Sequence, residues 1–240
     1  MQHIPVIDLT GALASGGARS AEVARQMRAA GEAAGFFYVI HHGLDAELVE
    51  RQFEAAKAIH EDLSDAEKRA LSLKHSPAGR GHERIGTQTL DASARPDVKE
   101  SFYCGIEYPP DHPYVQRGCY SYGANQWPAA LPWVREQSLE YIGAMCALAQ
   151  RLMQLLALSL DLPEGFFDHT RASPMVTLRM IRYPAHPADA DERTFGAGAH
   201  TDWGAITLLA QDAWGGLEVQ MPGGAWVPAT PIAGSLVVNL

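Results

Sequence analysis

The spacing of apolar residues predicts alternating strands and helices in the first part of the chain. Residues 4–7 and 36–40 are short apolar runs rich in β-branched or aromatic side chains, which is typical of strands. Pro5 places the first of them near a sheet edge. Between the two strands, Ser20 is expected to cap a helix that ends at Gly35.

A second helix is expected after Asp45, a residue type that caps helices. Apolar residues at helical spacing define the side expected to face the core: Val49, Phe53, Ala56, Ile59 and Leu63. Residues 64–67, Ser-Asp-Ala-Glu, form a capping-box pattern that opens a short third helix.

Residues 75–128 lack clear periodicity and are rich in Gly, Pro, His and aromatic residues. Short strands are expected around 100–106, inside a long irregular stretch. Two interpretations stay open for this stretch: it lines a site, or its His and Arg residues form a solvated surface.

A long helix is predicted at about 132–160, closed by Pro163. Its apolar stripe recurs every three or four residues and is expected to pack in the core without chemistry: Leu139, Ile142, Cys146, Ala149, Met153, Leu156 and Leu160. Gln150, Arg151 and Gln154 interrupt the apolar segment, so a membrane-spanning helix is not expected.

From Met175 onward the apolar spacing changes to two, which indicates strands. Strands are expected at 175–183, 197–202, 206–210, 217–220, 225–227 and 235–240. Many short strands at close spacing predict an antiparallel sandwich or barrel rather than a doubly wound sheet. Because no linker interrupts the chain, a single domain is expected: an N-terminal α/β region (1–110), a loop and long helix (111–170) and the first part of the β core (171–240).

Composition narrows the function classes. The chain has 240 residues, 47% hydrophobic and 20% charged, so it is able to bury a core. Its formal net charge is −9 and no basic run is longer than Lys68-Arg69, so neither nucleic acid nor a membrane surface is an expected partner. Cys104, Cys119 and Cys146 form no CxxC pair, and the first residues lack a signal-peptide pattern, so a cytoplasmic location is expected.

The candidate chemistry lies at His200-Thr201-Asp202, inside a predicted strand. Residues two apart in a strand point to the same face, so an imidazole and a carboxylate are able to bind one ion. This donor pair suits iron(II) in a two-His-one-carboxylate site. The same spacing recurs at His60-Glu61-Asp62, but there it falls within a predicted helix, where the side chains diverge. An ordinary core or surface histidine stays an alternative for His200.

Residues 198–209, GAHTDWGAITLL, resemble the metal strand of the iron(II)/2-oxoglutarate-dependent oxygenases, in the branch that includes isopenicillin N synthase. Further segments that resemble this family occur in the same order: IPVIDL at 4–9, GFFYVIHHGL at 35–44, KESF at 99–102, IRYP at 181–184, GGLEV at 215–219 and GSLVVNL at 234–240. The similarity covers essentially the whole chain.

The resemblance implies an α+β fold with a mainly β core, a double-stranded β-helix (jelly-roll) barrel flanked by N-terminal helices and one long packing helix. It implies Fe(II) as cofactor, bound by His200 and Asp202, with 2-oxoglutarate and O2 as cosubstrates. It also implies that Tyr183 lies near a carboxylate of the cosubstrate or substrate, although an ordinary aromatic residue at a strand end is the alternative. The implied reaction oxidises, by hydroxylation, a C–H bond of a small-molecule substrate and releases succinate and CO2.

One departure from the family pattern concerns the third ligand. In the family a second metal histidine and an Arg-x-Ser follow further along the chain, whereas here no histidine follows His200. The third ligand and the last barrel strands are therefore expected beyond Leu240. A partial copy of a longer protein is favoured over a natural truncation, because a barrel that ends at an unpaired apolar strand exposes its edge. The upstream His82, His169 and His186 do not fall at family positions.

Two alternative functions stay open at this point. One is a 2-oxoglutarate-independent iron oxidase of the isopenicillin N synthase type, and the other is a non-catalytic jelly-roll binding module. Relatives recognise their substrate with the irregular stretch, so the resemblance makes four of its residues candidate substrate contacts: Arg80, Glu83, Arg84 and Tyr103. Arg179 is a further candidate contact, because it shares a strand face with Tyr183 and is able to neutralise a carboxylate. For Arg179, a solvated arginine is the alternative. The sequence predicts no particular substrate or oligomeric state.

Overall fold

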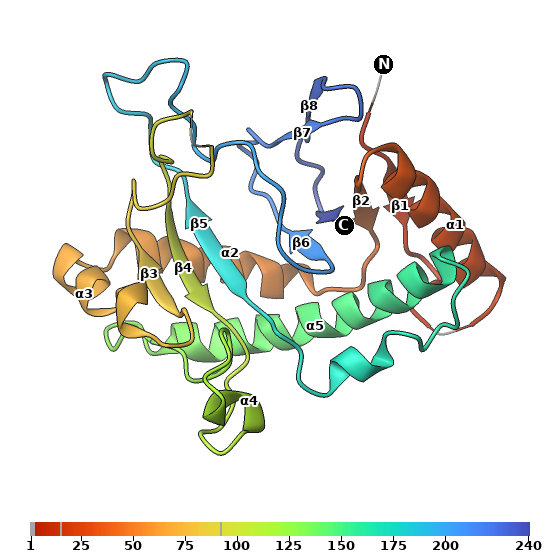
Figure 1. The fold of residues 1–240 in the computed structure, drawn as a ribbon, viewed down its shortest axis with the longest axis horizontal. Helices are drawn as coiled ribbons and strands as arrows, with labels where there is room; N and C mark the ends of the chain where they lie inside the picture. The colour runs from red at the N-terminus through yellow and green to blue at the C-terminus, as the bar shows by residue number, and fades with distance from the viewer. Residues whose placement is uncertain (1–2, 15, 92) are drawn as a thin grey trace. The chain divides into compact units, whose positions relative to one another are not determined.

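The computed structural model, drawn as a ribbon in Figure 1, describes residues 3–14, 16–91 and 93–240. The chain forms two compact units. The first unit comprises Met1–Ala46, Ala144–Pro174 and Asp202–Leu240. The second comprises Glu47–Gly143 and Met175–Thr201. Each unit therefore combines segments that lie far apart in the sequence.

The first unit contains a four-stranded sheet and a small hairpin. The sheet has the order β1 (Val6–Asp8), β2 (Phe36–Ile40), β9 (Ser235–Asn239) and β6 (Thr207–Leu209). β1 runs parallel to β2, and the other neighbours are antiparallel. The hairpin pairs β7 (Glu218–Gln220) with β8 (Trp226–Pro228). These strands confirm the apolar runs that the sequence predicted, and β1 lies at the expected sheet edge.

Helix α1 (Ala18–Ala33) packs beside this sheet and ends just before Gly35, as predicted. The prediction that Ser20 caps it is wrong. The N-cap position belongs to Gly17, and the Ser20 hydroxyl donates to the carbonyl oxygen of Gly16 at 2.9 Å. The helix begins three residues earlier than an N-cap at Ser20 implies, so the buried Ser20 hydroxyl lies within the first turn, where it bonds the backbone instead of capping the helix.

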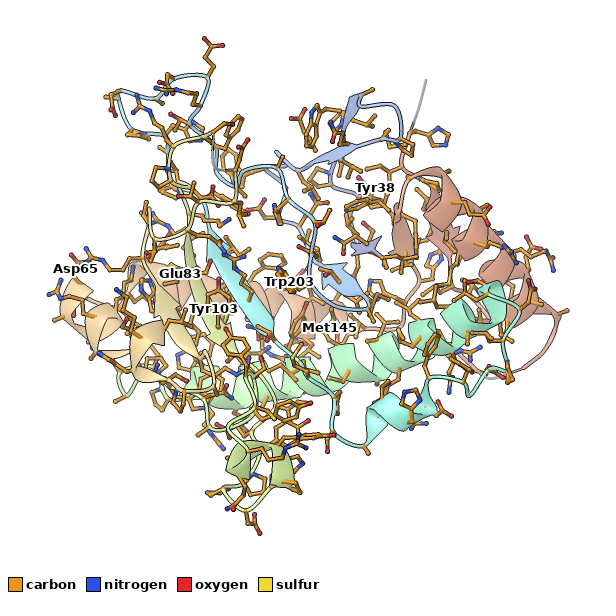
Figure 2. All side chains as sticks on the ribbon, viewed as in Figure 1. Tyr38, Asp65, Glu83, Tyr103, Met145 and Trp203 are labelled. Carbon is orange, nitrogen blue, oxygen red and sulfur yellow. The ribbon has the colours of Figure 1, made fainter. Side chains whose placement is uncertain are left out.

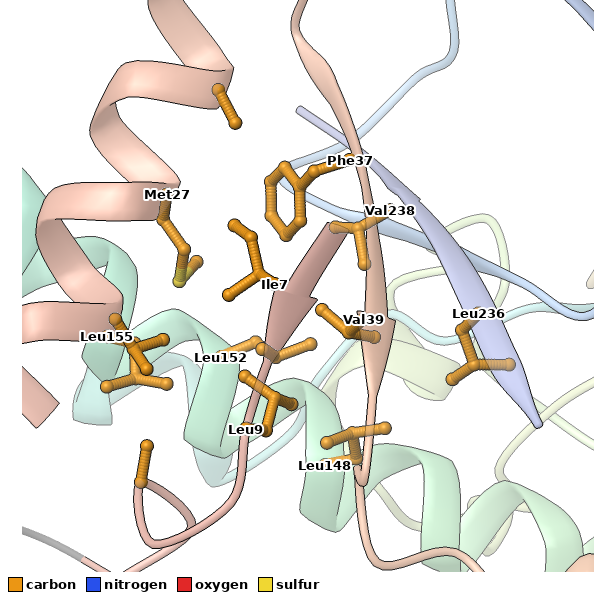
Figure 3. Packing of buried hydrophobic residues seen from close by; sticks show 13 residues of the cluster. Ile7, Leu9, Met27, Phe37, Val39, Leu148, Leu152, Leu155, Leu236 and Val238 are labelled. Atoms are coloured by element: carbon orange, nitrogen blue, oxygen red, sulfur yellow. The ribbon is translucent and has the colours of Figure 1, made fainter. Parts of the chain in front are cut away.

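The core of the first unit lies between α1, the sheet and the C-terminal part of α5 (Trp133–Ser159), as Figure 3 shows. It contains Ile7, Leu9, Met27, Phe37, Val39, Leu148, Leu152, Leu155, Leu236 and Val238. The long helix was predicted, but its inward stripe was placed one position away: Leu160 is 51% exposed, while Leu152 and Leu155 are fully buried. Apolar residues occur on several sides of α5, so its tertiary partners decide which side is buried.

By length and composition alone, α5 also passes for a membrane-spanning helix, with a mean hydropathy of 1.4 in its most apolar window. A core helix has the same composition, and Leu148, Leu152 and Leu155 of α5 lie in the core described above.

The second unit is built on the antiparallel sheet β3 (Gly81–Glu83), β4 (Glu100–Cys104) and β5 (Leu178–Arg182), in that order. It contains the helices α2 (Ala46–Glu61), α3 (Asp65–Ala70) and α4 (Pro113–Gln116) and a 3-10 turn at Leu73–His75. A second 3-10 turn, Asp168–Arg171, belongs to the first unit. The capping box at Ser64 and Glu67 is present as predicted.

The predicted inward face of α2 is correct at Ile59 and at Leu63 just after the helix, which are buried, but it is wrong by about one residue earlier in the helix. Its buried residues include Leu48, Gln52 and His60, whereas Phe53 is 38% exposed. Two polar residues face inward because β5 offers them partners: Gln52 Nε2 contacts the Met180 sulfur at 3.1 Å and His60 Nε2 lies 3.1 Å from the Met180 carbonyl oxygen. An apolar periodicity does not detect a buried face that contains polar side chains.

The irregular stretch at 75–128 is held by a buried arginine. Arg80 is fully buried, and its guanidinium donates to the carbonyl oxygens of Cys104, Ser121 and Val176 at 2.7–3.0 Å. A side chain with these backbone partners supports the loop, so Arg80 does not fit the predicted role of a substrate contact. β3 lies in the same stretch and had no clear signal in the sequence.

Residues 197–202, all of them described, contain no strand, so the predicted strand around the His-x-Asp motif is wrong. The chain there runs irregularly from the end of β5 to the start of β6. Glycines at 196, 198 and 204 explain the difference, because glycine weakens strands and allows irregular backbone.

Candidate metal centre

Two sets of histidine and carboxylate side chains have the residue types of a metal site. One is the predicted pair, His200 and Asp202. The other is a buried cluster, His60, His82 and Glu100, whose ligand atoms lie within 4.8 Å of one another. The geometry of each set is described in turn.

The buried cluster lies where α2 meets β3 and β4 of the second unit. The side chains of His60, His82 and Glu100 are 1%, 2% and 6% exposed. His82 Nε2 lies 3.0 Å from Glu100 Oε2, and His60 Nδ1 lies 3.7 Å from the same oxygen. His60 Nδ1 and His82 Nδ1 are buried without a hydrogen-bond partner within the described part of the chain.

Burial sets the protonation of these groups. It lowers the pKa of His60 to about 4 and also lowers the pKa of His82, so both imidazoles are neutral at pH 7. Burial opposes ionisation of Glu100, but the hydrogen bond with His82 and the positive groups around it lower its pKa to about 2. Neutral imidazoles and an ionised carboxylate are the forms that bind a metal ion.

Two cations already neutralise the carboxylate of this cluster. Lys68 Nζ lies 3.2 Å from Glu100 Oε2 and also donates to the His60 carbonyl oxygen, while Arg182 Nη1 lies 3.0 Å from Glu100 Oε1. A divalent ion at Glu100 Oε2 would sit beside the Lys68 ammonium, which like-charge repulsion disfavours. The cluster is therefore a buried ion network, although its donor types match a metal site.

Sequence reasoning did not find this cluster. The helical spacing of His60-Glu61-Asp62 argues against a metal site at His60, and His82 does not lie at a position that the family uses for a metal ligand. What joins them is the pairing of β3 with β4, which places His82 opposite Phe102 and close to Glu100. No local pattern in the sequence reports that pairing.

His200 lies in the second unit, exposed, on the irregular segment after β5. Its Nδ1 is 2.8 Å from the carbonyl oxygen of Gly198. Because a carbonyl oxygen only accepts hydrogen bonds, Nδ1 is the donor in this contact. Metal-binding histidines show the same arrangement, in which the second ring nitrogen donates to a backbone carbonyl or carboxylate.

Asp202 belongs to the first unit and is also exposed. Its Oδ2 accepts a hydrogen bond from Asn239 Nδ2 at 3.0 Å. Asn239 is the last residue of β9, so a residue of the four-stranded sheet orients this carboxylate. Each predicted ligand thus has a partner of its own, without the common strand that the sequence predicted.

Tyr183, the third predicted site residue, directly follows β5 and is 55% exposed. A Cβ atom at Gly196 would lie 2.8 Å from its Cδ1 atom, so the ring packs closely against the segment that leads to His200. Only glycine at 196 allows this approach.

A polar network covers one side of β3, β4 and β5 near Tyr183. Tyr103 donates to Glu83 at 2.7 Å, and both side chains are labelled in Figure 2. Arg179 donates to Ser101 Oγ at 3.0 Å and to Gln88 Oε1 at 2.9 Å, and its guanidinium lies 5.0 Å from the centre of the Tyr103 ring. The structure thus brings together three of the predicted substrate contacts, Glu83, Tyr103 and Arg179, in one network.

Two family models match most of the chain. The model described as "non-haem dioxygenase in morphine synthesis N-terminal" matches residues 4–130, and the one described as "2OG-Fe(II) oxygenase superfamily" matches residues 173–240. A relative from Emericella nidulans, named "2-oxoglutarate-Fe(II) type oxidoreductase hxnY", is 40% identical over 98% of this chain and 69% of its own length.

Solved structures of a protein from Neurospora crassa are similar as well. The full-length Neurospora protein in complex with alpha-KG, another name for 2-oxoglutarate, has a TM-score of 0.83 at 29% identity, over 98% of this chain and 72% of that chain. Its complex with alpha-KG and thymine has a TM-score of 0.83 at 28% identity, over 98% of this chain and 73% of that chain. Such neighbours have the jelly-roll fold, which agrees with the predicted fold class and with the mixed helices and sheets observed.

Proposed function

Since this chain belongs to the 2OG-Fe(II) oxygenase superfamily, we propose that His200 and Asp202 are two of the protein ligands to its iron. Membership makes it an iron(II)- and 2-oxoglutarate-dependent dioxygenase, with Fe(II) as cofactor and 2-oxoglutarate and O2 as cosubstrates. Its relatives are named for this activity, so a 2-oxoglutarate-independent oxidase and a non-catalytic binding module are not favoured.

The observation that carries the proposal is the hydrogen bond between His200 Nδ1 and the Gly198 carbonyl oxygen. It turns Nδ1 toward the backbone, so Nε2 is the ring nitrogen that would bind Fe(II). Asp202 contributes a carboxylate whose Oδ2 is already oriented by Asn239. A nitrogen and an oxygen donor, each oriented by a second residue, fit the mixed ligand set of non-haem iron.

Tyr183 is proposed to contact a carboxylate of the cosubstrate or substrate. Its exposed ring lies against Gly196, close in sequence to His200, so its hydroxyl is available as a donor. Bound iron, with 2-oxoglutarate and O2, supplies the oxidising chemistry in which 2-oxoglutarate becomes succinate and CO2 and the substrate gains an oxygen atom.

The proposed substrate is a small organic molecule that is hydroxylated at a C–H bond. Structures of the Neurospora protein contain thymine or 5-formyluracil, which supports a substrate of this size for this chain. Glu83, Tyr103 and Arg179 offer both acceptors and donors on one side of their sheet, which favours a substrate with polar groups of both kinds.

The test is an anaerobic calorimetric titration of the protein with Fe(II). His200→Ala and Asp202→Ala are each expected to lose the binding, while His186→Ala, which removes an exposed histidine of the second unit, is expected to keep it. Iron binding that is the same in His200→Ala as in the unaltered protein would contradict the ligand assignment. For Tyr183→Phe, a raised KM for 2-oxoglutarate is expected, with succinate release as the measurement.

A further inference from the structure

Gly198 connects the candidate ligand His200 to a buried ion pair in the second unit. Its backbone N–H donates to Asp97 Oδ1 at 3.1 Å, and its carbonyl oxygen accepts from His200 Nδ1 at 2.8 Å. Gly198 therefore contacts a buried carboxylate through its N–H group and the candidate ligand through its carbonyl group. Neither partner is adjacent to Gly198 in sequence.

Asp97 is held by a second buried residue. Its other oxygen, Oδ2, lies 2.7 Å from Lys99 Nζ, and the two side chains are 0% and 3% exposed. Lys99 thus neutralises a carboxylate that would otherwise be buried as an isolated charge, which is strongly unfavourable. With its charge balanced on one oxygen, Asp97 is able to present the other to the Gly198 N–H.

The backbone near Gly198 is fixed by further hydrogen bonds to the segment that contains Asp97. Arg95 N donates to Arg193 O at 3.0 Å, and Val98 N donates to Phe195 O at 2.9 Å. The contact from Asp97 to Gly198 continues this series toward His200. Beyond Gly198, the series ends and the exposed ligand segment begins.

Gly198 also lies too close to a neighbouring backbone for any larger residue. A Cβ atom there would lie 2.9 Å from Asp91 N and 3.0 Å from Asp91 Cβ. The glycine therefore has a defined place between Asp91 and the Asp97 carboxylate. These contacts restrict the position of the Gly198 backbone, whose carbonyl oxygen faces His200 Nδ1.

We propose that Asp97, neutralised by Lys99, is a positioning residue for His200. By holding the Gly198 N–H, it keeps the Gly198 carbonyl facing His200 Nδ1, so that Nδ1 donates to the backbone and the imidazole ring is held in one orientation. The consequence for metal binding rests on the proposed role of His200 as an iron ligand. Partners of this kind alter metal affinity by about 10- to 100-fold when they are removed.

Lys99 and Glu100 are the first two residues of KESF (99–102), one of the segments that resemble the oxygenase family. Lys99 and Glu100 are neighbours with different partners: Lys99 pairs with Asp97, which holds Gly198, whereas Glu100 joins the buried cluster with His82. An extended chain directs successive side chains to opposite sides, so the pair supports two separate buried networks.

The test compares two double variants that both lack the ion pair. Asp97→Asn with Lys99→Met keeps an oxygen that accepts from Gly198, whereas Asp97→Ala with Lys99→Met removes it. The destabilisation from losing the ion pair is common to both, so their difference reports on the acceptor. If the alanine variant does not fold, Asp97→Leu with Lys99→Met fills the same space without an acceptor.

The first readout is nitrogen NMR of the His200 ring in the metal-free protein, with hydrogen exchange of the Gly198 amide. The asparagine variant is expected to keep the Nδ1–H form and a protected amide, as in the unaltered protein. The alanine variant is expected to show a mixture of ring tautomers and amide exchange faster by about 10-fold, which corresponds to the loss of one hydrogen bond. Identical ring and amide signals in the two variants would overturn the proposal.

The second readout is the Fe(II) affinity of the same variants, measured anaerobically. The alanine variant is expected to bind Fe(II) about 10-fold more weakly than the asparagine variant. Equal affinity together with a changed ring tautomer would overturn the link between Asp97 and metal binding. A wrong assignment of His200 as an iron ligand would give a different result. The His200→Ala protein would then still bind iron, while the two double variants would still differ in their NMR signals.

Discussion

The two histidine–carboxylate sets of this chain use the same residue types in opposite surroundings. His60, His82 and Glu100 are almost completely buried, and Lys68 and Arg182 contact the carboxylate. His200 and Asp202 are exposed, and each is oriented by a hydrogen bond from or to a neutral backbone or amide group. Residue types alone therefore do not distinguish a metal centre from a structural ion network.

The difference lies in what compensates the carboxylate. At Glu100 the compensating charges are built into the protein, so that the cluster gains stability and has no need of an ion. At Asp202 the hydrogen bond from Asn239 Nδ2 orients the carboxylate, as a partner beside a metal ligand does. Substitutions in the two sets and the pH dependence of stability test this contrast.

Removing the carboxylate of the buried cluster is expected to have the largest effect. Glu100→Ala leaves Lys68 and Arg182 without their counter-charge and His82 without its hydrogen-bond partner, so we expect the free energy of unfolding to fall by about 3–5 kcal/mol, measured by urea denaturation. The control is Glu61→Ala: Glu61 is 44% exposed and lies 3.8 Å from Arg182, so it is expected to cost less than about 1 kcal/mol. Equal losses would show that the cluster is not a compensated ion network.

The pH dependence of stability tests the protonation states of the same cluster. The pKa of His60 is lowered from 6.5 to about 4, so the unfolded chain binds the proton more readily than the folded one. The stability it contributes is complete above pH 6.5 and is lost as the pH falls toward 4, a loss of about 3 kcal/mol. His60→Gln is expected to flatten this decline in unfolding experiments across that range, and an unchanged decline would contradict the assignment.

Glu100 acts in the same direction at lower pH. Its pKa is lowered from 4.5 to about 2, so its contribution is complete above pH 4.5 and is lost as the pH falls toward 2. In the His60→Gln variant, a shallower decline is therefore expected below pH 6.5, because burial also lowers the pKa of His82, and Glu100 adds to it below pH 4.5.

A smaller effect is expected from closing the space beside the candidate ligand. Gly198→Ala places a Cβ against the Asp91 backbone, so we expect a loss of about 1–3 kcal/mol in thermal unfolding, together with weaker Fe(II) binding. Gly143→Ala is the control: it lies within α5 with no atom within 4 Å of the added Cβ, so about 0.5–1 kcal/mol of stabilisation is expected. A Gly198→Ala protein as stable as the Gly143→Ala protein would remove the argument from close packing.

Sequence patterns were reliable where the structure depends on local interactions. The five residues of β2 were predicted at their observed bounds, since a run of aromatic and β-branched side chains specifies a buried strand by itself. The capping box at Ser64 was also correct, because both of its hydrogen bonds join residues three apart.

The patterns failed where distant segments decide. The inward face of α2 contains Gln52 and His60, whose partners on β5 lie more than a hundred residues away, at separations of 128 and 120. The His-x-Asp motif lies on irregular backbone rather than on a strand. Resemblance to the family is the ground for the chemistry proposed for this motif, whereas the role proposed for Asp97 depends on a contact with Gly198 across 101 residues that no pattern reports.

The most direct measurement of the central claim is the Fe(II) affinity of His200→Ala beside that of His82→Gln, under anaerobic conditions. His82→Gln removes an imidazole from the buried cluster and leaves the exposed segment as it is. If His200 is an iron ligand, we expect the His200→Ala protein to lose its iron and the His82→Gln protein to bind iron as the unaltered protein does. Iron retained by His200→Ala and lost by His82→Gln would place the metal in the buried cluster and contradict the assignment of His200.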